Sequence, residues 1–137
     1  MCDQLVWLAR INEERYIMCC EHGVTHIIWG SVSIRIPTNE LSDIASQLHQ
    51  AAQLAAQYRI ASNYLVTVIC NQHDQFQLWI RGGGLHLMPD DFQLFVKMMQ
   101  QAGNHPLAQK MASEKDASSE SKEERPFQVP PKLYSVN

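Results

Sequence analysis

The chain has 137 residues, of which 45% are hydrophobic, and its formal net charge is −3 at pH 7. This length suits a single domain, and this composition excludes a wholly disordered chain. Lys and Arg form no basic run in the body of the chain, which disfavours a nucleic-acid partner. No apolar stretch approaches the ~20 residues of a membrane span, and no signal-peptide pattern opens the sequence. We therefore expect a cytoplasmic protein with reduced cysteines and no membrane contact.

Residues 5–36 have the pattern of four consecutive strands separated by short polar turns. The last of these strands, 32–36, alternates strictly between apolar and polar residues, which is typical of a strand with one buried face. Turns as short as those at 22–23 and 30–31 join only antiparallel neighbours, so the pattern predicts a meander. Apolar residues at helical spacing then predict a long amphipathic helix over roughly 39–59.

The second half of the chain repeats this plan. Strand patterns at 64–70, 76–80 and 85–87 are followed by a helix that opens at Pro89 and carries an apolar face. We therefore predict an α+β fold of antiparallel meander sheets with two amphipathic helices on one side of the sheets, in the order ββββα–βββα.

An internal duplication explains this order. Cys20 and Cys70 match at an offset of 50, as do Trp29 and Trp79, while the last strand and the helix of each half match at 51. These matches predict one domain over 1–104, with repeat halves 5–59 and 60–104.

Residues 105–137 are predicted to be a disordered tail. The segment 112–125 has no large apolar residue and cannot form a core. The segment 126–137 contains three prolines together with apolar residues, among them Phe127 and Tyr134. Two interpretations fit this end: a frayed terminus, or a docking peptide for a partner or for the chain's own domain.

A Cys/His hairpin is the most unusual cluster, because thiolates and imidazoles are ligands for zinc and related metals. The turn at 22–23 would bring Cys19 opposite His26, with Cys20 and His22 nearby. Adjacent strand residues point to opposite faces, however, and the Cys-x2-Cys spacing of structural zinc is absent. Three interpretations of the hairpin remain: a pair of buried thiols beside a turn histidine, a metal site, or a reactive or redox thiol.

No arrangement of nucleophile, base and orienting group is evident, so the sequence predicts neither an enzyme nor a cofactor. Asp90 and Asp91 are explained by the dipole of the helix that they open. That helix also carries apolar residues beyond one core face, which suits either a homodimer contact or a helix covered on two sides within the monomer. The candidate partner-binding residues are Leu94, Met98, Phe127 and Tyr134.

Four short motifs follow one another along residues 15–50: Cys20-Glu21-His22-Gly23, Trp29-Gly30, Ile34-x-Ile36 and Glu40-Leu41. In this region the chain resembles small bacterial proteins of uncharacterised function. In those proteins a Cys-rich hairpin precedes an aromatic-Gly turn, an alternating strand and a helix. That family carries no known activity, so the resemblance transfers none.

The repeated order of meandering strands and a helix also looks like the Whirly, Pur and PC4-type domains that bind single-stranded nucleic acid. In those families the sheet surfaces carry aromatic and basic residues. The resemblance implies a nucleic-acid surface on a sheet face with Arg15, Arg35 and Arg81, although the acidic body departs from the pattern. The leading hypothesis is a non-enzymatic protein-binding or regulatory module, with single-stranded nucleic-acid binding and metal binding as alternatives.

Overall fold

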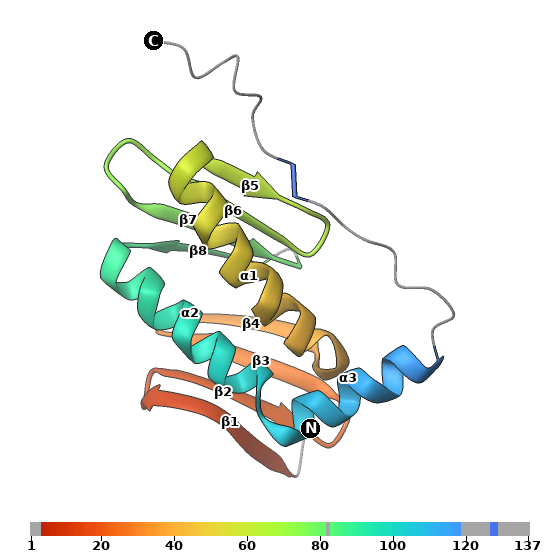
Figure 1. Cartoon of the computed structure of the whole chain (residues 1–137). Helices are drawn as coiled ribbons and strands as arrows, with labels where there is room; N and C mark the ends of the chain where they lie inside the picture. The colour runs from red at the N-terminus through yellow and green to blue at the C-terminus, as the bar shows by residue number, and fades with distance from the viewer. Residues whose placement is uncertain (1–3, 82, 119–126, 129–137) are drawn as a thin grey trace.

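A computed structural model describes residues 4–81, 83–118 and 127–128. Within these ranges the chain forms eight strands and three helices (Figure 1). The fold is α+β, and the order ββββα–βββα expected from the sequence is confirmed. The structure adds two elements to this order: a short strand at the start of the second half, and a third helix that follows the second half.

The strands form two antiparallel sheets of four, each a simple meander. The first sheet contains β1 (Leu5–Asn12), β2 (Arg15–Cys20), β3 (Val24–Trp29) and β4 (Val32–Pro37). The second sheet contains β5 (Ile60–Ser62), β6 (Val66–Cys70), β7 (Phe76–Ile80) and β8 (Gly83–Leu87). Strand β4 lies beside β8, so the two sheets adjoin along these edges (Figure 1).

The turns follow from glycine where the backbone needs a positive φ. Gly23 (φ 77°) and Gly30 (φ 62°) close the β2–β3 and β3–β4 hairpins in the left-handed region that glycine enters without strain. In the second half, Gly83 and Gly84 do not have this role. A Cβ on Gly83 would lie 2.8 Å from the Ile34 side chain, so this glycine instead lets β8 approach β4.

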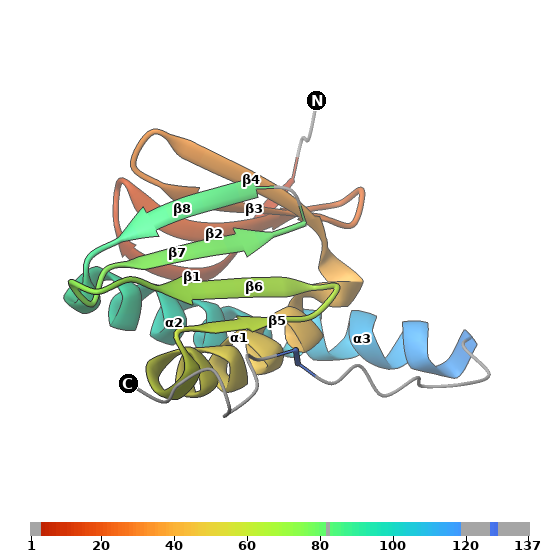
Figure 2. The ribbon, with the colours of Figure 1, turned by 90° about the horizontal axis from the view of Figure 1, so that it is seen from above.

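Three helices lie on one side of the two sheets (Figure 2). Helix α1 (Thr38–Tyr58) ends at Arg59 in the left-handed conformation, and α2 (Pro89–Gly103) begins with proline at its first turn. The domain was expected to end at 104, but residues Pro106–Ser118 form a third helix, α3, which packs against α1. Disorder is predicted for the whole of 105–137; within that range, residues 119–126 and 129–137 lie outside the described residues.

Each long helix packs mainly on the sheet of the other half. Helix α1 follows the first sheet but covers β5 and β6, whereas α2 follows the second sheet and covers β1 and β2 (Figure 1). The two helices cross closely at Gly103, where an added Cβ would lie 2.8 Å from the Cβ of Ala45. The interior between helices and sheets forms one continuous apolar core.

The pairing registers show how the halves correspond. Cys19 pairs with Thr25 in the first sheet and Cys70 with Phe76 in the second, a shift of 51 residues for both partners. The offset of 50 that matched Cys20 with Cys70 and Trp29 with Trp79 is wrong by one residue. A one-residue slip moves every side chain to the other face of a strand, and Trp29 is in fact buried while Trp79 is exposed.

Candidate functional site

The outer sheet face, which points away from the helices, is the most distinctive open surface of the described chain. In the first sheet it has two rows of cross-strand neighbours, Trp7–Met18–His26–Arg35 and Arg10–Tyr16–Ile28–Ser33. In the second sheet the corresponding rows are Ile60–Ile69–Gln77–His86 and Ser62–Thr67–Trp79–Gly84. We use "outer sheet face" for these residues.

Two tryptophans on this face are exposed yet held in place. Trp7 is 47% exposed; it meets the Tyr16 ring edge-on at 5.0 Å, and the Arg10 guanidinium lies 5.0 Å from the Trp7 ring centroid. Trp79 is 48% exposed, and its ring lies against the backbone of its cross-strand partner, within 2.7 Å of where a Cβ on Gly84 would stand. Both indoles are therefore presented to solvent at little further cost in side-chain entropy on binding.

The charge on this face differs from that of the whole molecule. Within the described ranges, none of the eight strands contains Asp or Glu; the acidic residues lie in turns and helices. Arg10 and Arg35 are exposed on the outer sheet face, where no described carboxylate pairs with either of them. Although the chain has a net charge of −3, the described residues of its outer sheet face include cations and no anions.

The three arginines predicted to bind nucleic acid are not brought together. Arg35 lies on the outer sheet face, but Arg15 is in the inner row, stacked over Trp29 at 4.7 Å and 3.6 Å from Asp91. Arg81 sits in the β7–β8 turn, with Nη2 2.9 Å from Oε2 of Glu40. Arg35 is therefore the one of the three that faces outward without a described ion pair.

The predicted metal ligands are also separated. Cys19 is buried in the core and pairs with Thr25 rather than with His26, whose partner is Met18 on the outer face. The Sγ of Cys20 lies 4.0 Å from Nδ1 of His22. Across the described residues, no group of three or more His, Cys, Asp or Glu side chains could hold a metal ion.

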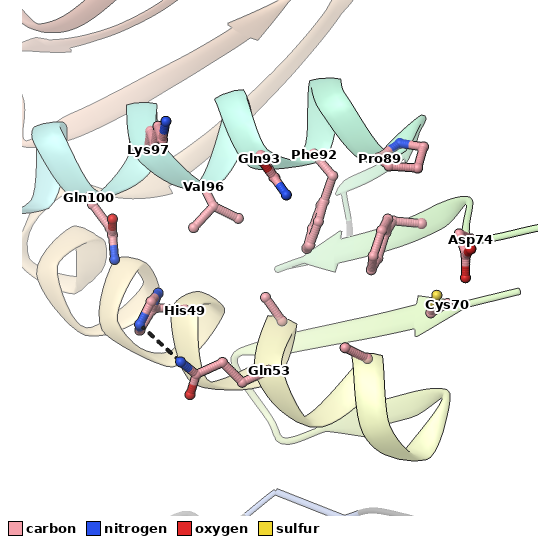
Figure 3. Close-up of a pocket in the computed structure, with 13 residues that line it drawn as sticks. His49, Gln53, Cys70, Asp74, Pro89, Phe92, Gln93, Val96, Lys97 and Gln100 are labelled. Carbon is pink, nitrogen blue, oxygen red and sulfur yellow. Dashed lines mark hydrogen bonds between the residues drawn. The ribbon is translucent and has the colours of Figure 1, made fainter.

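A groove of about 660 Å³ lies between α1 and α2, where the two helices diverge from their crossing (Figure 3). Its floor is apolar, with the Phe76 and Phe92 rings stacked at 4.0 Å. Small side chains on α1, Ala52 and Ala56, leave the space open. Figure 3 shows Phe92 pointing from α2 toward α1. The rim is polar and includes His49, Gln53, Asp74, Gln93, Lys97 and Gln100.

Two groups that line this groove have other partners. His49 Nε2 lies 3.5 Å from the Gln53 amide nitrogen, and the Cys70 thiol is 3.7 Å from Nη1 of Arg59.

Cys19, on the corresponding strand of the other sheet, has its thiol pKa raised above the ordinary value by burial and by the neighbouring Cys20. A raised pKa keeps this thiol protonated at neutral pH and therefore a poor nucleophile.

The predicted partner-binding residues have different environments. Leu94 is 38% exposed on α2, whereas Met98 is only 2% exposed, so Met98 belongs to the monomer core and cannot form a dimer contact. Phe127 is half-buried against the core, and Gln128 pairs with Ser62 of β5. Tyr134 lies outside the described residues.

Sequence reasoning missed Trp7, Arg10, Tyr16 and Trp79 as candidate contact residues. The signal was present in the second sheet, because Trp79 interrupts an alternating strand on its polar side.

No family model, curated protein or solved structure matches this chain. None of the described helices is long and apolar enough to cross a bilayer.

Proposed function

We propose that this protein is a non-enzymatic binding module that recognises another protein through its outer sheet face. The observation that carries the proposal is the composition of that face, which combines exposed Trp and Arg with partly buried Tyr, Met and Ile and has no Lys, Asp or Glu among its described residues. Protein–protein interfaces are enriched in aromatic residues, Met and Arg, and depleted of Lys, Glu and Asp. The indole rings of Trp7 and Trp79, which contact Tyr16 and Gly84, are of the residue type most often found at binding hot spots.

The charge of the face indicates the partner's chemistry. Arg10 and Arg35 would be paired by a partner that offers carboxylates around an apolar centre. A second copy of this chain is a poor fit, because a two-fold interface must be self-complementary and the outer sheet face has no carboxylate to pair with its arginines. We therefore favour a different, acidic protein over self-association through this face.

Comparing surface variants of the full chain in affinity capture tests the proposal. We expect Trp7→Ser/Trp79→Ser to weaken binding of the captured partner at least tenfold, measured with the purified partner. The matched control, Met88→Ser/Leu94→Ser, changes two exposed apolar residues on the helix side and should bind as the wild type does. A partner that binds the tryptophan variant normally would refute the proposal.

Single-stranded nucleic acid is the second candidate, favoured by one observation: exposed indoles and arginines share a face that has no carboxylate. A fluorescent 20-nucleotide deoxythymidine oligomer, titrated at low and moderate salt, separates the candidates. Nucleic-acid binding predicts an affinity that falls steeply with salt and is lost in Trp7→Ser/Trp79→Ser. The absence of binding at low salt would remove this candidate and leave the protein partner.

A further inference from the structure

The outer edge of β5 carries a short strand contact that neither the sheet face nor the groove explains. Gln128 N donates to Ser62 O at 2.6 Å, and Ser62 N donates to Gln128 O at 3.1 Å, so the two residues form one antiparallel bridge. Phe127, the preceding residue, is half-buried against the core. Figure 1 shows this two-residue piece, in dark blue, beside β5 and distant in sequence from it.

The hydrogen bonds of β5 show which of its backbone groups face outward. Arg59 O accepts from Cys70 N, and Asn63 N donates to Val66 O, so these odd-numbered residues bond toward β6. Alternation along an antiparallel strand then turns the N–H and C=O of both Ile60 and Ser62 toward the open edge. Ser62 is used by Gln128, whereas no described residue pairs with Ile60 on that side.

The residues that flank Gln128 in the sequence limit how many main-chain hydrogen bonds the chain's own segment can donate to this edge. The positions that would pair next along an antiparallel ladder are two residues before and two residues after Gln128. They are Pro126 and Pro130, and proline has no N–H to donate. A proline-free strand can therefore form more main-chain hydrogen bonds with this edge than the chain's own segment, whose prolines accept but do not donate.

We propose that the outer edge of β5 is a strand-addition site for an extended, proline-free segment of a partner protein, and that Phe127–Gln128 occupies this site within the same chain. Main-chain bonds to Ser62 and Ile60 would supply the affinity, and the half-buried position of Phe127 would take an aromatic side chain. The partner's strand must displace the tail, so the tail lowers the affinity of the site without abolishing it.

Two labelled peptides test the site on the full chain. One has the native order Arg-Pro-Phe-Gln-Val-Pro-Pro-Lys, and the other replaces its prolines by threonine. We expect the proline-free peptide to bind about tenfold more tightly than the native one in fluorescence anisotropy. A third peptide, the proline-free sequence methylated at the Gln main-chain nitrogen, should lose binding, because its pairing residue no longer donates to Ser62. Equal affinities of the first two, or binding of the methylated peptide, would overturn the proposal.

Two tail variants test occupancy by Phe127–Gln128. Gln128→Pro removes the N–H that donates to Ser62 and should raise the affinity of the proline-free peptide about tenfold. Gln128→Ala keeps the backbone N–H and should behave as the wild type. Trp7→Ser/Trp79→Ser should also bind the peptide normally, which separates this site from the outer sheet face. Self-association of Gln128→Pro without peptide binding would mean that a second copy fills the edge and would refute a partner strand.

Discussion

At the residue scale, Gly103 sets how closely α1 and α2 approach. An added Cβ would lie 2.8 Å from the Cβ of Ala45, so one of the two helices must shift to accept it. Alanine is otherwise a better helix former than glycine, which opposes this effect by up to about 1 kcal/mol. Overpacking typically costs about 1–3 kcal/mol, so we expect Gly103→Ala to lower the free energy of unfolding by about 1 kcal/mol in urea denaturation.

A double-mutant cycle isolates this contact from helix propensity. Ala45→Gly alone should destabilise α1, but it removes the opposing Cβ, and the pair Gly103→Ala/Ala45→Gly should therefore lose less stability than the two single changes added together. Additive losses would show that the close approach of these two residues does not limit the packing of the helices.

The Cys19 thiol leads to a prediction about pH. Burial and Cys20 raise its pKa above the ordinary value of 9.0, so in the folded state it ionises at higher pH than in the unfolded state. Above about pH 9 the unfolded chain loses this proton and the folded chain keeps it, so stability falls as pH rises. We expect Cys19→Ala to flatten the decline measured between pH 8 and pH 10.5, and iodoacetamide to alkylate Cys19 far more slowly in the folded protein than in urea. Rapid alkylation of the folded protein would contradict this.

Individual site residues were predictable only where the evidence was local. The inner position of Arg15 follows from alternation with Ile17, because residues two apart on a strand share a face. The partners that hold Arg15 and Arg81 are Asp91 and Glu40, and each lies far along the chain. Such a contact depends on how the helices pack on the sheets, and no local sequence pattern predicts it.

At the element scale, Glu40 joins three parts of the fold. Its carboxylate lies 2.9 Å from Arg81 in the β7–β8 turn and 3.3 Å from Lys115 on α3, and its side chain is only 12% exposed. Both cations are more than a third exposed, so solvent screens these pairs. We expect Glu40→Gln to lower stability by about 0.5–1 kcal/mol and to increase hydrogen exchange in α3.

Asp43 provides the matched control for this prediction. It lies one turn further along α1, is exposed and has no described ion pair, so Asp43→Asn should leave exchange in α3 unchanged. Faster exchange in both variants would mean that the charge of α1, rather than the contact of Glu40 with Lys115, controls the docking of α3.

Among the elements, α3 shows where composition misleads. Residues 106–118 are polar, and the segment was assigned to a disordered tail. Ala108 is its one fully buried apolar residue in this range, Leu107 is partly buried against the core, and polar contacts of Gln109 with Ser42 and of Lys115 with Glu40 join it to α1. A helix that needs so little apolar surface leaves only a weak signal of hydrophobic periodicity, so the sequence could not predict it.

At the scale of the whole molecule, the order of every strand except β5 and both amphipathic helices followed from periodicity, and antiparallel pairing followed from the short turns, because each depends on neighbours along the chain. The exchange of helices between the halves did not. The apolar stripe of α1, which includes Leu41, Ile44 and Leu48, shows that the helix must be covered but not which sheet covers it.

This exchange predicts that neither half folds alone. A fragment of residues 1–59 retains the first sheet and α1 but lacks β5 and β6, on which α1 packs, and residues 60–137 likewise lack β1 and β2 beneath α2. Each fragment would expose an apolar helix face and an uncovered sheet, so we expect neither to give a cooperative thermal transition as a monomer. Mixed at equal concentrations, the fragments should restore the circular dichroism and cooperative unfolding of the intact chain. A monomeric fragment that unfolds cooperatively without its partner would show that each half stabilises itself, and that the exchanged helices only join two independent units.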